Sequence, residues 1–427
     1  MPQQSRKLIV CCDGTWNEPY HFGAHTNVVK MVRAILPADA DGVAQMVYYH
    51  PGVGTGNIVD RFMGGTLGIG LSANVQAAYD FLATNFVDGD KIYLFGFSRG
   101  AYTARSLAGL IGLVGGLLEK RDMDLFPFVY AIYRSREHRQ ALASGTRADT
   151  ERAIRALFSA KQLGGNFDRL TQAILGNRTT QIFFIGVWDT VGALGIPLGW
   201  LRWVGKRLYD FHDTDLSERI RFAYHALAID ERRKSFVPTL WTRPKGRGTD
   251  QDATRQTLEQ VWFAGAHSNV GGGYPDGALS DIAFLWMVGK AASAHWTNDT
   301  GRPLAFDTEY LKNTDQRMGL LRDSGAGLVW RLAGLRARPV CDRPPEDKET
   351  CESIHWSARF RYQCTDERRF SPFPYRPDNL AKALGQAGTI VTELSAMEQE
   401  YHRWNDSSID IGSQAGTLDQ DARVNRV

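Results

Sequence analysis

The sequence is poor in cysteine, and its cysteines lack metal-binding spacing. It has five cysteines in 427 residues, an odd number, and no C-x-x-C pair occurs. A disulfide framework is therefore not expected, and Cys341, Cys351, His355 and Cys364 are too scattered to predict a zinc site. We expect a reduced protein that holds no metal.

Long apolar runs are also missing. The most apolar of the longer stretches, LAGLIGLVGGLL at 107–118, is too short to span a bilayer and rich in glycine, so we expect a buried helix. The first residues, MPQQSRKLIVCCDG, have no apolar core long enough for a secretory signal. A cytoplasmic protein is the default expectation, with export left open to a secretion system that needs no signal peptide.

Charge and glycine patterns argue against two further classes. The formal net charge is only +3, and no basic tract with interleaved aromatic residues occurs, so nucleic-acid binding is not expected. The glycine-rich stretches at 51–57 and 64–70 lack the G-K-[ST] ending of a phosphate-binding loop. No G-x-G-x-x-G opens a helix after the first apolar run, and we therefore expect no nucleotide and no other cofactor.

The sequence does contain a series of short apolar runs, each followed by turn residues. The runs are apolar nearly throughout, which is typical of strands buried on both faces of a parallel sheet. Helical patterns lie between them, for example over residues 71–86. This alternation predicts an α/β fold with a mostly parallel central sheet and helices on both faces. The runs and their turns are LIVCC–DGTWN, AQMVYYH–PGVGTG, KIYLFGF–SRG, QIFFIGVW–DTVG and VWFAG–AHSNVGGG.

Two stretches interrupt this alternation of strand and helix patterns and suggest how the chain is divided into domains. Residues 119–180 are charged, mostly helical in pattern and without a strand candidate, so we expect a helical insertion that caps the site. After residue 300 the strand pattern fades, and arginine, proline and aromatic residues dominate. We therefore expect a main domain over 1–300 and a C-terminal extension over 301–427 that packs on it.

The sharpest motif is G-x-S-x-G at residues 96–100, within KIYLFGFSRGAYTARS. A buried strand is expected before it and a helix after it, which is the context of a nucleophile elbow. Such a turn is strained so that the serine hydroxyl projects from the sheet. We therefore predict Ser98 as a nucleophile. The alternative is a glycine-bounded turn whose serine only caps the helix.

A serine nucleophile needs a base, and the base needs an orienting carboxylate. In this architecture the chain order is serine, then acid, then histidine. Asp189 follows the apolar run 181–188 and is the predicted acid, with turn formation as its alternative role. Asp210, Asp213 and Asp215 lie in YDFHDTDLSERI, where we expect them to cap a helix instead.

His267 is the predicted base, because it follows both Ser98 and Asp189 and lies on a loop just past a buried run. His225, in RFAYHALAI, is expected on a helix as a packed core residue. The histidines before Ser98 have the wrong chain order. Weaker candidates that remain open are His295, His355 and His402.

The tetrahedral intermediate also needs two hydrogen-bond donors for its oxyanion. One is predicted to be the backbone N–H of Arg99, the residue after the nucleophile. The other is expected from the loop CCDGTWNEP, through the N–H of Gly14 or Thr15. Asp13 is expected to hold this loop by accepting backbone hydrogen bonds.

Four segments in this order resemble the α/β-hydrolase family that contains the type VI secretion phospholipase effectors. They are CDGTWN, GFSRGAYTAR, VWDTVGALG, and AHSNVGGGY followed by LSDIAFLWM, over roughly residues 7–290. The resemblance implies an α/β-hydrolase fold, a serine esterase or lipase activity, and Ser98, Asp189 and His267 as the catalytic triad. The family usually has H-S-D-V-G-G-G-Y, so Asn269 stands where an acid is usual.

The working hypothesis is a serine hydrolase that cleaves carboxylic esters through an acyl-enzyme, with a lipid or phospholipid substrate before small soluble esters. Residues 193–211 mix aliphatic, tryptophan and cationic side chains. They form either a lid that contacts the membrane surface or a helix packed beside the pocket. The alternative function is a non-catalytic binding or scaffold protein that keeps the hydrolase fold.

Overall fold

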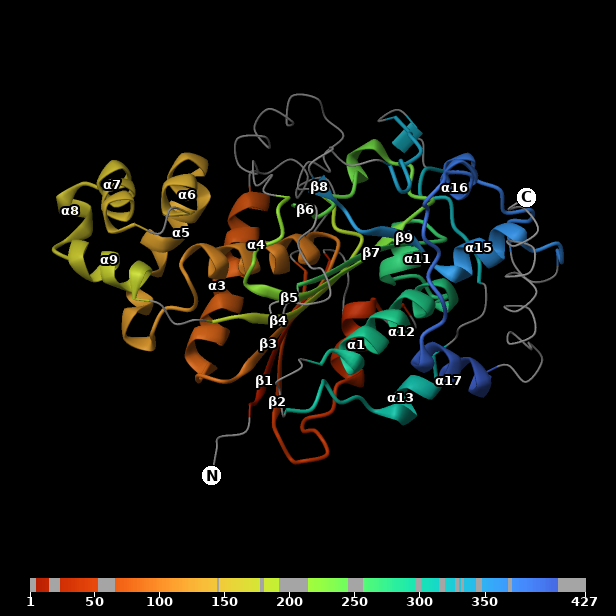
Figure 1. Cartoon of the computed structure of the whole chain (residues 1–427), viewed down its shortest axis with the longest axis horizontal. Helices are drawn as coiled ribbons and strands as arrows, with labels where there is room; N and C mark the ends of the chain where they lie inside the picture. The colour runs from red at the N-terminus through yellow and green to blue at the C-terminus, as the bar shows by residue number, and fades with distance from the viewer. Residues whose placement is uncertain are drawn as a thin grey trace.

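The structure is a computed structural model built around one parallel sheet of seven strands, in the order β2-β1-β3-β4-β5-β7-β9 (Figure 1). It describes residues 5–14, 24–52, 66–143, 146–176, 180–191, 214–244, 256–295, 301–314, 319–326, 330–331, 334–342, 348–367 and 371–405. The strands are β1 Lys7–Cys12, β2 Gln45–His50, β3 Lys91–Phe97, β4 Ile182–Trp188, β5 Ile220–Ala228, β7 Thr257–Phe263 and β9 Glu352–Ile354.

The sheet confirms the predicted α/β architecture. Every residue of β1, β3 and β4 is buried, as the nearly continuous apolar runs indicated. Because all strands run in parallel, their carboxyl ends meet at one edge of the sheet. The loops after β1, β3, β4 and β7, which carry the predicted site residues, therefore lie along this edge.

The prediction of a helix over residues 221–229 was wrong, because residues 220–228 form the strand β5. A short apolar run fits both a buried helix and a buried strand, and here the long-range pairing with β4 and β7 decides. His225 is fully buried in this strand, as a packed core residue. Its Nδ1–H donates to Gln260 Oε1 at 3.2 Å, and its Nε2 accepts from the Thr190 amide at 3.1 Å.

Helices cover both faces of the sheet (Figure 1). Helices α3 Thr66–Asn85 and α4 Arg99–Leu113 share a core with Leu8 and Val10 of β1. Helices α1 Asn27–Ala34 and α12 Ala278–Ser293 share the opposite core with Ile9 and Cys11. Alternate residues of one strand thus face opposite helical layers. In the described part of the chain, no helix is long and apolar enough to cross a membrane.

The insertion folds into helices that lie together at one side of the molecule, joined to the α3–α4 layer (Figure 1). Phe126, Val129 and Ile132 of this segment enter the same core as α3 and α4. Its role as a cap stays a prediction. The helices are η1 Lys120–Leu125, α5 Phe126–Arg134, α6 Arg136–Ala143, α7 Arg147–Leu157, α8 Ala160–Leu163 and α9 Phe167–Leu175.

The residues after 300 contribute to the sheet as well as packing on it. The strand β9 pairs with β7 through residues 352–354 and extends the parallel sheet by one strand. Three residues are too few to show a strand pattern in the sequence. Two short strands, β6 Arg243–Pro244 and β8 Lys348–Glu349, form a separate antiparallel pair. The helices here are α13 Thr308–Lys312, α15 Trp356–Gln363, α16 Asp378–Leu384 and α17 Ala396–Asn405.

Candidate active site

The G-x-S-x-G motif forms a sharp turn between β3 and α4. Ser98 has φ 56° and ψ −119°, a combination of backbone angles that residues other than glycine rarely adopt. A Cβ on Gly96 would lie 2.6 Å from the carbonyl oxygen of Gly100, and one on Gly100 would lie 2.1 Å from that of Cys12. Both glycines are therefore needed for β1, β3 and α4 to approach at this turn.

Asp189 directly follows β4 and is fully buried. Its backbone also has a positive φ, 38°, which turns the chain sharply out of the strand. The carboxylate accepts a hydrogen bond from the Ala228 amide at the end of β5, with 3.0 Å between Oδ1 and N. The neighbouring strand thus helps to set the orientation of this acid.

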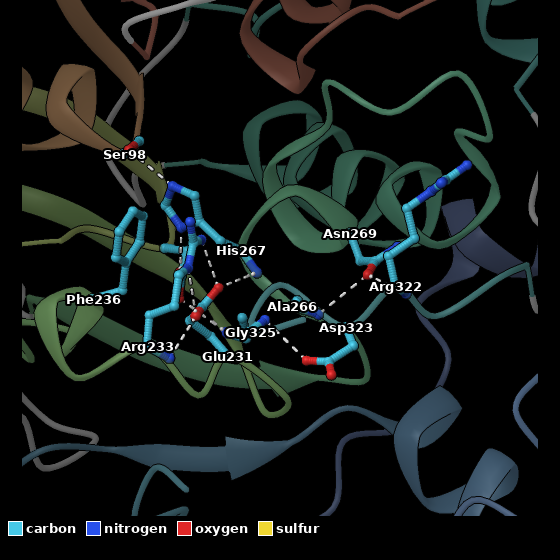
Figure 2. A network of polar contacts seen from close by, with 12 residues as sticks. Ser98, Glu231, Arg233, Phe236, Ala266, His267, Asn269, Arg322, Asp323 and Gly325 are labelled. Atoms are coloured by element: carbon cyan, nitrogen blue, oxygen red, sulfur yellow. Dashed lines mark hydrogen bonds and ion pairs between the residues drawn. The ribbon is translucent and has the colours of Figure 1, made fainter. Parts of the chain in front are cut away.

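His267 connects Ser98 and Asp189. Its Nε2 lies 2.8 Å from Ser98 Oγ as the acceptor (Figure 2). Its Nδ1–H donates to Asp189 Oδ2 at 2.6 Å. The loop expected here is instead the start of a short helix, α11 His267–Gly271. The structure therefore brings the three predicted residues into one hydrogen-bonded chain, which is the geometry that base-assisted attack by a hydroxyl requires.

Two aromatic rings contact the imidazole of His267, and an acid accepts a hydrogen bond from its backbone. The ring of Phe97 lies 4.7 Å away and that of Phe236 lies 5.0 Å away, the latter edge-on (centroid distances). The His267 backbone N–H donates to Glu231 Oε2 at 3.3 Å. Only 5% of His267 is exposed, so little water competes for its hydrogen bonds.

Arg338 is a site residue that we did not predict. Its Nη1 lies 2.6 Å from Asp189 Oδ1, and its Nη2 lies 3.1 Å from Asp189 Oδ2. Complete burial raises the pKa of Asp189, but Arg338 and His267 lower this pKa by more than burial raises it. The pKa of Asp189 is therefore well below the usual range of an aspartate. No local pattern around residue 338 points to this role, because the contact joins positions 149 residues apart.

Glu231 and Arg233 form a second acid–arginine pair beside His267, also not predicted (Figure 2). Their closest atoms, Oε2 and Nη2, are 2.8 Å apart, and Glu231 is fully buried. Burial raises the pKa of Glu231, but the hydrogen bond and charge of Arg233 lower it overall. Arg233 also stacks on Phe236, with its guanidinium carbon 3.5 Å from the ring centroid.

The loop after β1 lies against the nucleophile turn, as the contact of Gly100 with this loop requires. The Asp13 carboxylate accepts from the Gly14 amide at 2.7 Å, from Thr26 Oγ1 at 2.7 Å and from Tyr49 Oη at 3.0 Å. The Gly14 N–H is therefore engaged by Asp13 in this structure. Thr15 lies outside the described residues.

The three consecutive glycines after His267 allow close packing. A Cβ on Gly271 would lie 1.9 Å from the ring of Phe97. Gly272 and Gly273 have φ values of 84° and 104°, which other residues rarely adopt. Gly272 forms an antiparallel bridge with Thr26, so the glycines bring the end of α11 against the start of α1.

Asn269 uses its amide to hold the C-terminal part of the chain. Its Nδ2 donates to the Leu320 carbonyl at 3.1 Å. Its Oδ1 accepts from the Arg322 amide at 3.2 Å (Figure 2). Oδ1 also accepts from the Ala266 amide at 3.3 Å. An ionised aspartate could make the two acceptor contacts but not the donor contact.

The other predicted features have different surroundings or fall outside the described residues. His355 pairs with Glu398 at 2.8 Å and is fully buried, which fits a structural role. In the described ranges, no group of three or more histidine, cysteine or acidic side chains gathers as a metal site. The predicted lid at 193–211 lies outside the described residues.

Comparisons with known proteins identify a family for most of the chain. The family described as "T6SS, Phospholipase effector Tle1-like, catalytic domain" matches residues 6–290. The uncharacterized protein YEL023C of Saccharomyces cerevisiae is 29% identical over 251 residues, 56% of this chain and 33% of the yeast protein. The chain thus spans about a third of the length of this curated relative.

Two solved structures show partial likeness. One, an uncharacterized protein from Pseudomonas aeruginosa, is 19% identical, covers 72% of this chain and 47% of its own, and has a TM-score of 0.35. The other, a Tle1 effector bound to the VgrG spike of the type VI secretion system, is 19% identical, with coverage of 64% and 51% and a TM-score of 0.31. From the family match over 6–290, the chain belongs to the Tle1-like phospholipase effector family of type VI secretion, and these residues correspond to the catalytic domain of that family.

Proposed function

We propose that the protein is a serine hydrolase that cleaves carboxylic esters of apolar acyl chains, with phospholipids or glycerolipids as its main substrates. The observation that carries this proposal is the hydrogen-bonded chain from Ser98 through His267 to Asp189. The strained backbone of Ser98 adds support, because such strain gathers at functional sites.

In the proposed reaction, His267 Nε2 takes the proton of Ser98 as its Oγ attacks the ester carbonyl carbon. The ionised Asp189 stabilises the imidazolium that forms. We propose that the amides of Arg99 and of Thr15 or Gly14 hold the oxyanion, Thr15 being favoured because the Gly14 N–H already donates to Asp13. The imidazolium then protonates the leaving alcohol, and a water deprotonated by His267 releases the acid from Ser98.

Apolar side chains beside the site support a lipid substrate. Val237 follows Phe236, the ring that contacts His267, and 62% of Val237 is exposed. Leu320, whose carbonyl accepts from Asn269, is 40% exposed. These exposed apolar side chains lie in segments that contact His267 and Asn269, where acyl chains or a lipid surface could bind them.

Substrate preference can be measured directly. Hydrolysis rates for p-nitrophenyl esters of increasing acyl length, with and without phosphatidylcholine liposomes, should rise with length and with the liposomes. A preference for the acetate ester with no liposome effect would contradict the lipid proposal while leaving the esterase proposal intact.

Turnover itself is tested by labelling with a fluorophosphonate, which forms a covalent adduct with activated serines. We expect an adduct on Ser98 in the folded wild-type protein and none in Ser98→Ala. A folded wild-type protein that forms no adduct would favour the alternative, a non-catalytic scaffold with the hydrolase fold.

The division of the chain and its cellular route are also proposals. We propose a catalytic domain over residues 1–300 with a cap at 119–180, and an extension over 301–427 that completes the site.

Membership of a type VI effector family is consistent with export that needs no signal peptide. A solved relative is bound to a VgrG spike, and we propose that this chain uses a comparable spike protein, testable by co-purification.

A further inference from the structure

Within the described part of the chain, the hydrogen bonds of Arg338 all lie inside the candidate site. Both of its terminal nitrogens contact Asp189, one to each carboxylate oxygen. Nη1 also donates to the carbonyl of Ala228 at 2.9 Å, and Nη2 donates to the carbonyl of Phe236. Only 5% of Arg338 is exposed. The guanidinium is thus held from two directions, by the acid and by carbonyls at the end of β5 and in the chain that follows it.

With Arg338 in place, each oxygen of Asp189 receives two donors. Oδ1 accepts from Arg338 and the Ala228 amide, and Oδ2 accepts from His267 and Arg338. A carboxylate with four donors in fixed directions cannot rotate without losing hydrogen bonds. The charge of Arg338 also offsets much of the field that Asp189 would otherwise exert on His267.

We propose that Arg338 is a positioning residue for the Asp189–His267 pair: it fixes the orientation of the acid and, by balancing its charge, makes protonation of the pair less favourable. This inference rests on the proposed function. It also assigns a site role to a residue beyond 6–290, the range that matches the family's catalytic domain.

The titratable groups considered next are either paired with another group or neutral, so the charge of Asp189 is balanced by Arg338. Glu231, which faces His267 from the chain after β5, is matched by Arg233. His225, on β5 beside Asp189, has its pKa lowered to about 3, chiefly by burial and by Arg105, and is therefore neutral near pH 7. Tyr274, near Glu231, has its pKa raised, chiefly by burial, and is neutral as well.

The test compares Arg338→Met, which keeps an unbranched apolar side chain in place of the aliphatic stem and removes the charged guanidinium, with a matched control. Arg361 is also a fully buried arginine of the C-terminal part, and it donates to the carbonyls of Gly319 at 3.0 Å and Ser371 at 2.8 Å. Arg361→Met should therefore show the general cost of removing a buried arginine. Circular dichroism identifies the variants that are folded.

The measurement is ester hydrolysis as a function of pH, resolved into kcat and KM. We expect Arg338→Met to lower kcat by roughly tenfold to a hundredfold, as for residues that orient metal ligands, with a smaller change in KM. The acid limb of its pH profile should move to higher pH, because the Asp189–His267 pair then binds a proton more readily. Arg338→Lys keeps the cation and should return the limb toward its wild-type position, and Arg361→Met should leave the limb in place.

An acid limb that is unchanged in folded Arg338→Met would overturn the inference, whatever happens to kcat. If the wild-type protein proves inactive, the proposed function fails, and the inference is then decided by an NMR titration of the His267 imidazole in the folded proteins. An upward shift in Arg338→Met that is absent from Arg361→Met supports the role of Arg338. Equal titration in the two variants refutes it.

Discussion

The parts of the chain before residue 290 and after residue 300 contribute to the site in different ways. In the first part, Ser98, Asp189 and His267 each lie at or near the carboxyl end of a buried strand. In the second part, Arg338 and Leu320 lie in segments without helix or strand, and they reach the site through hydrogen bonds to Asp189 and Asn269. The first part contains the proposed reacting groups, and the second part contacts two of the segments that carry them.

The two parts of the chain differ in what determines the position of their site residues. A parallel sheet brings the ends of its strands together whatever the loops contain, so the placement of the reacting groups follows from the fold. The contacts of the C-terminal part depend on individual side chains and leave no periodic pattern. The comparison predicts that changes in the first part act mainly on chemistry, whereas changes in the second part act on stability and on the orientation of the site.

The largest expected effect is that of Ser98→Ala. Removal of the nucleophile should lower kcat by a factor on the order of 10⁶, as in other triad hydrolases. The unfolding midpoint in urea should stay close to that of the wild type, because Ser98 supplies a nucleophile and not a core contact. Residual ester hydrolysis near the wild-type rate would contradict the assignment of this serine.

The next effect tests the link between the two parts. Asp189→Asn should lower kcat by about 10⁴-fold, because the amide no longer selects the correct imidazole tautomer. It should also lower the free energy of unfolding by about 3–5 kcal/mol, because it leaves Arg338 buried without a countercharge. Equilibrium urea unfolding and ester kinetics measure the two effects separately.

A double variant and a control sharpen this test. Asp189→Asn combined with Arg338→Met should recover part of the lost stability but none of the lost activity. Asp39→Asn breaks another buried pair, in which Asp39 Oδ2 lies 2.5 Å from Lys7 Nζ, away from the candidate site. It should lower stability and leave kcat unchanged. If the double variant regains activity, Asp189 does not orient the base.

The pH dependence of stability tests the C-terminal part alone. Burial raises the pKa of Glu398, but His355 and Ser395 lower it to about 2, below the ordinary 4.5. Because the folded-state pKa is depressed, the ionised carboxylate stabilises the fold above about pH 4.5, and this contribution is lost as the pH falls through about 2. Urea unfolding midpoints between pH 7 and pH 2 should fall less steeply in Glu398→Gln than in the wild type. Parallel curves would show that the His355 pair adds no stability.

The smallest effect concerns Asn269. Asn269→Asp removes the donor to the Leu320 carbonyl and places a carboxylate against it, which should cost about 1–3 kcal/mol. Activity should fall less than stability, because His267 keeps its own hydrogen bonds. Asn313→Asp is a control, since Asn313 donates to the Glu309 carbonyl in the exposed α13 region. A stability loss equal to that of the control would mean that Asn269 does not couple the two parts.

Part of the fold and part of the candidate site could be predicted from the sequence, and the rest could not. The strands β1, β2, β3, β4 and β7 were predicted from their apolar runs, and the order of serine, acid and histidine selected Ser98, Asp189 and His267. The segment 220–228 was misassigned because a short apolar run does not distinguish a buried helix from a buried strand. Arg338 was missed because nothing near it in the chain marks a partner 149 residues away.

The sequence by itself determined the parallel sheet and the residues at its carboxyl edge, because hydrophobic burial acts on every residue of a strand and leaves a readable pattern. Only the tertiary structure decided which arginine neutralises Asp189, why Asn269 suits its position, and how closely the glycines after His267 pack on Phe97. These features depend on distances of a few ångströms between segments far apart in the chain, and local periodicity carries no information about such distances.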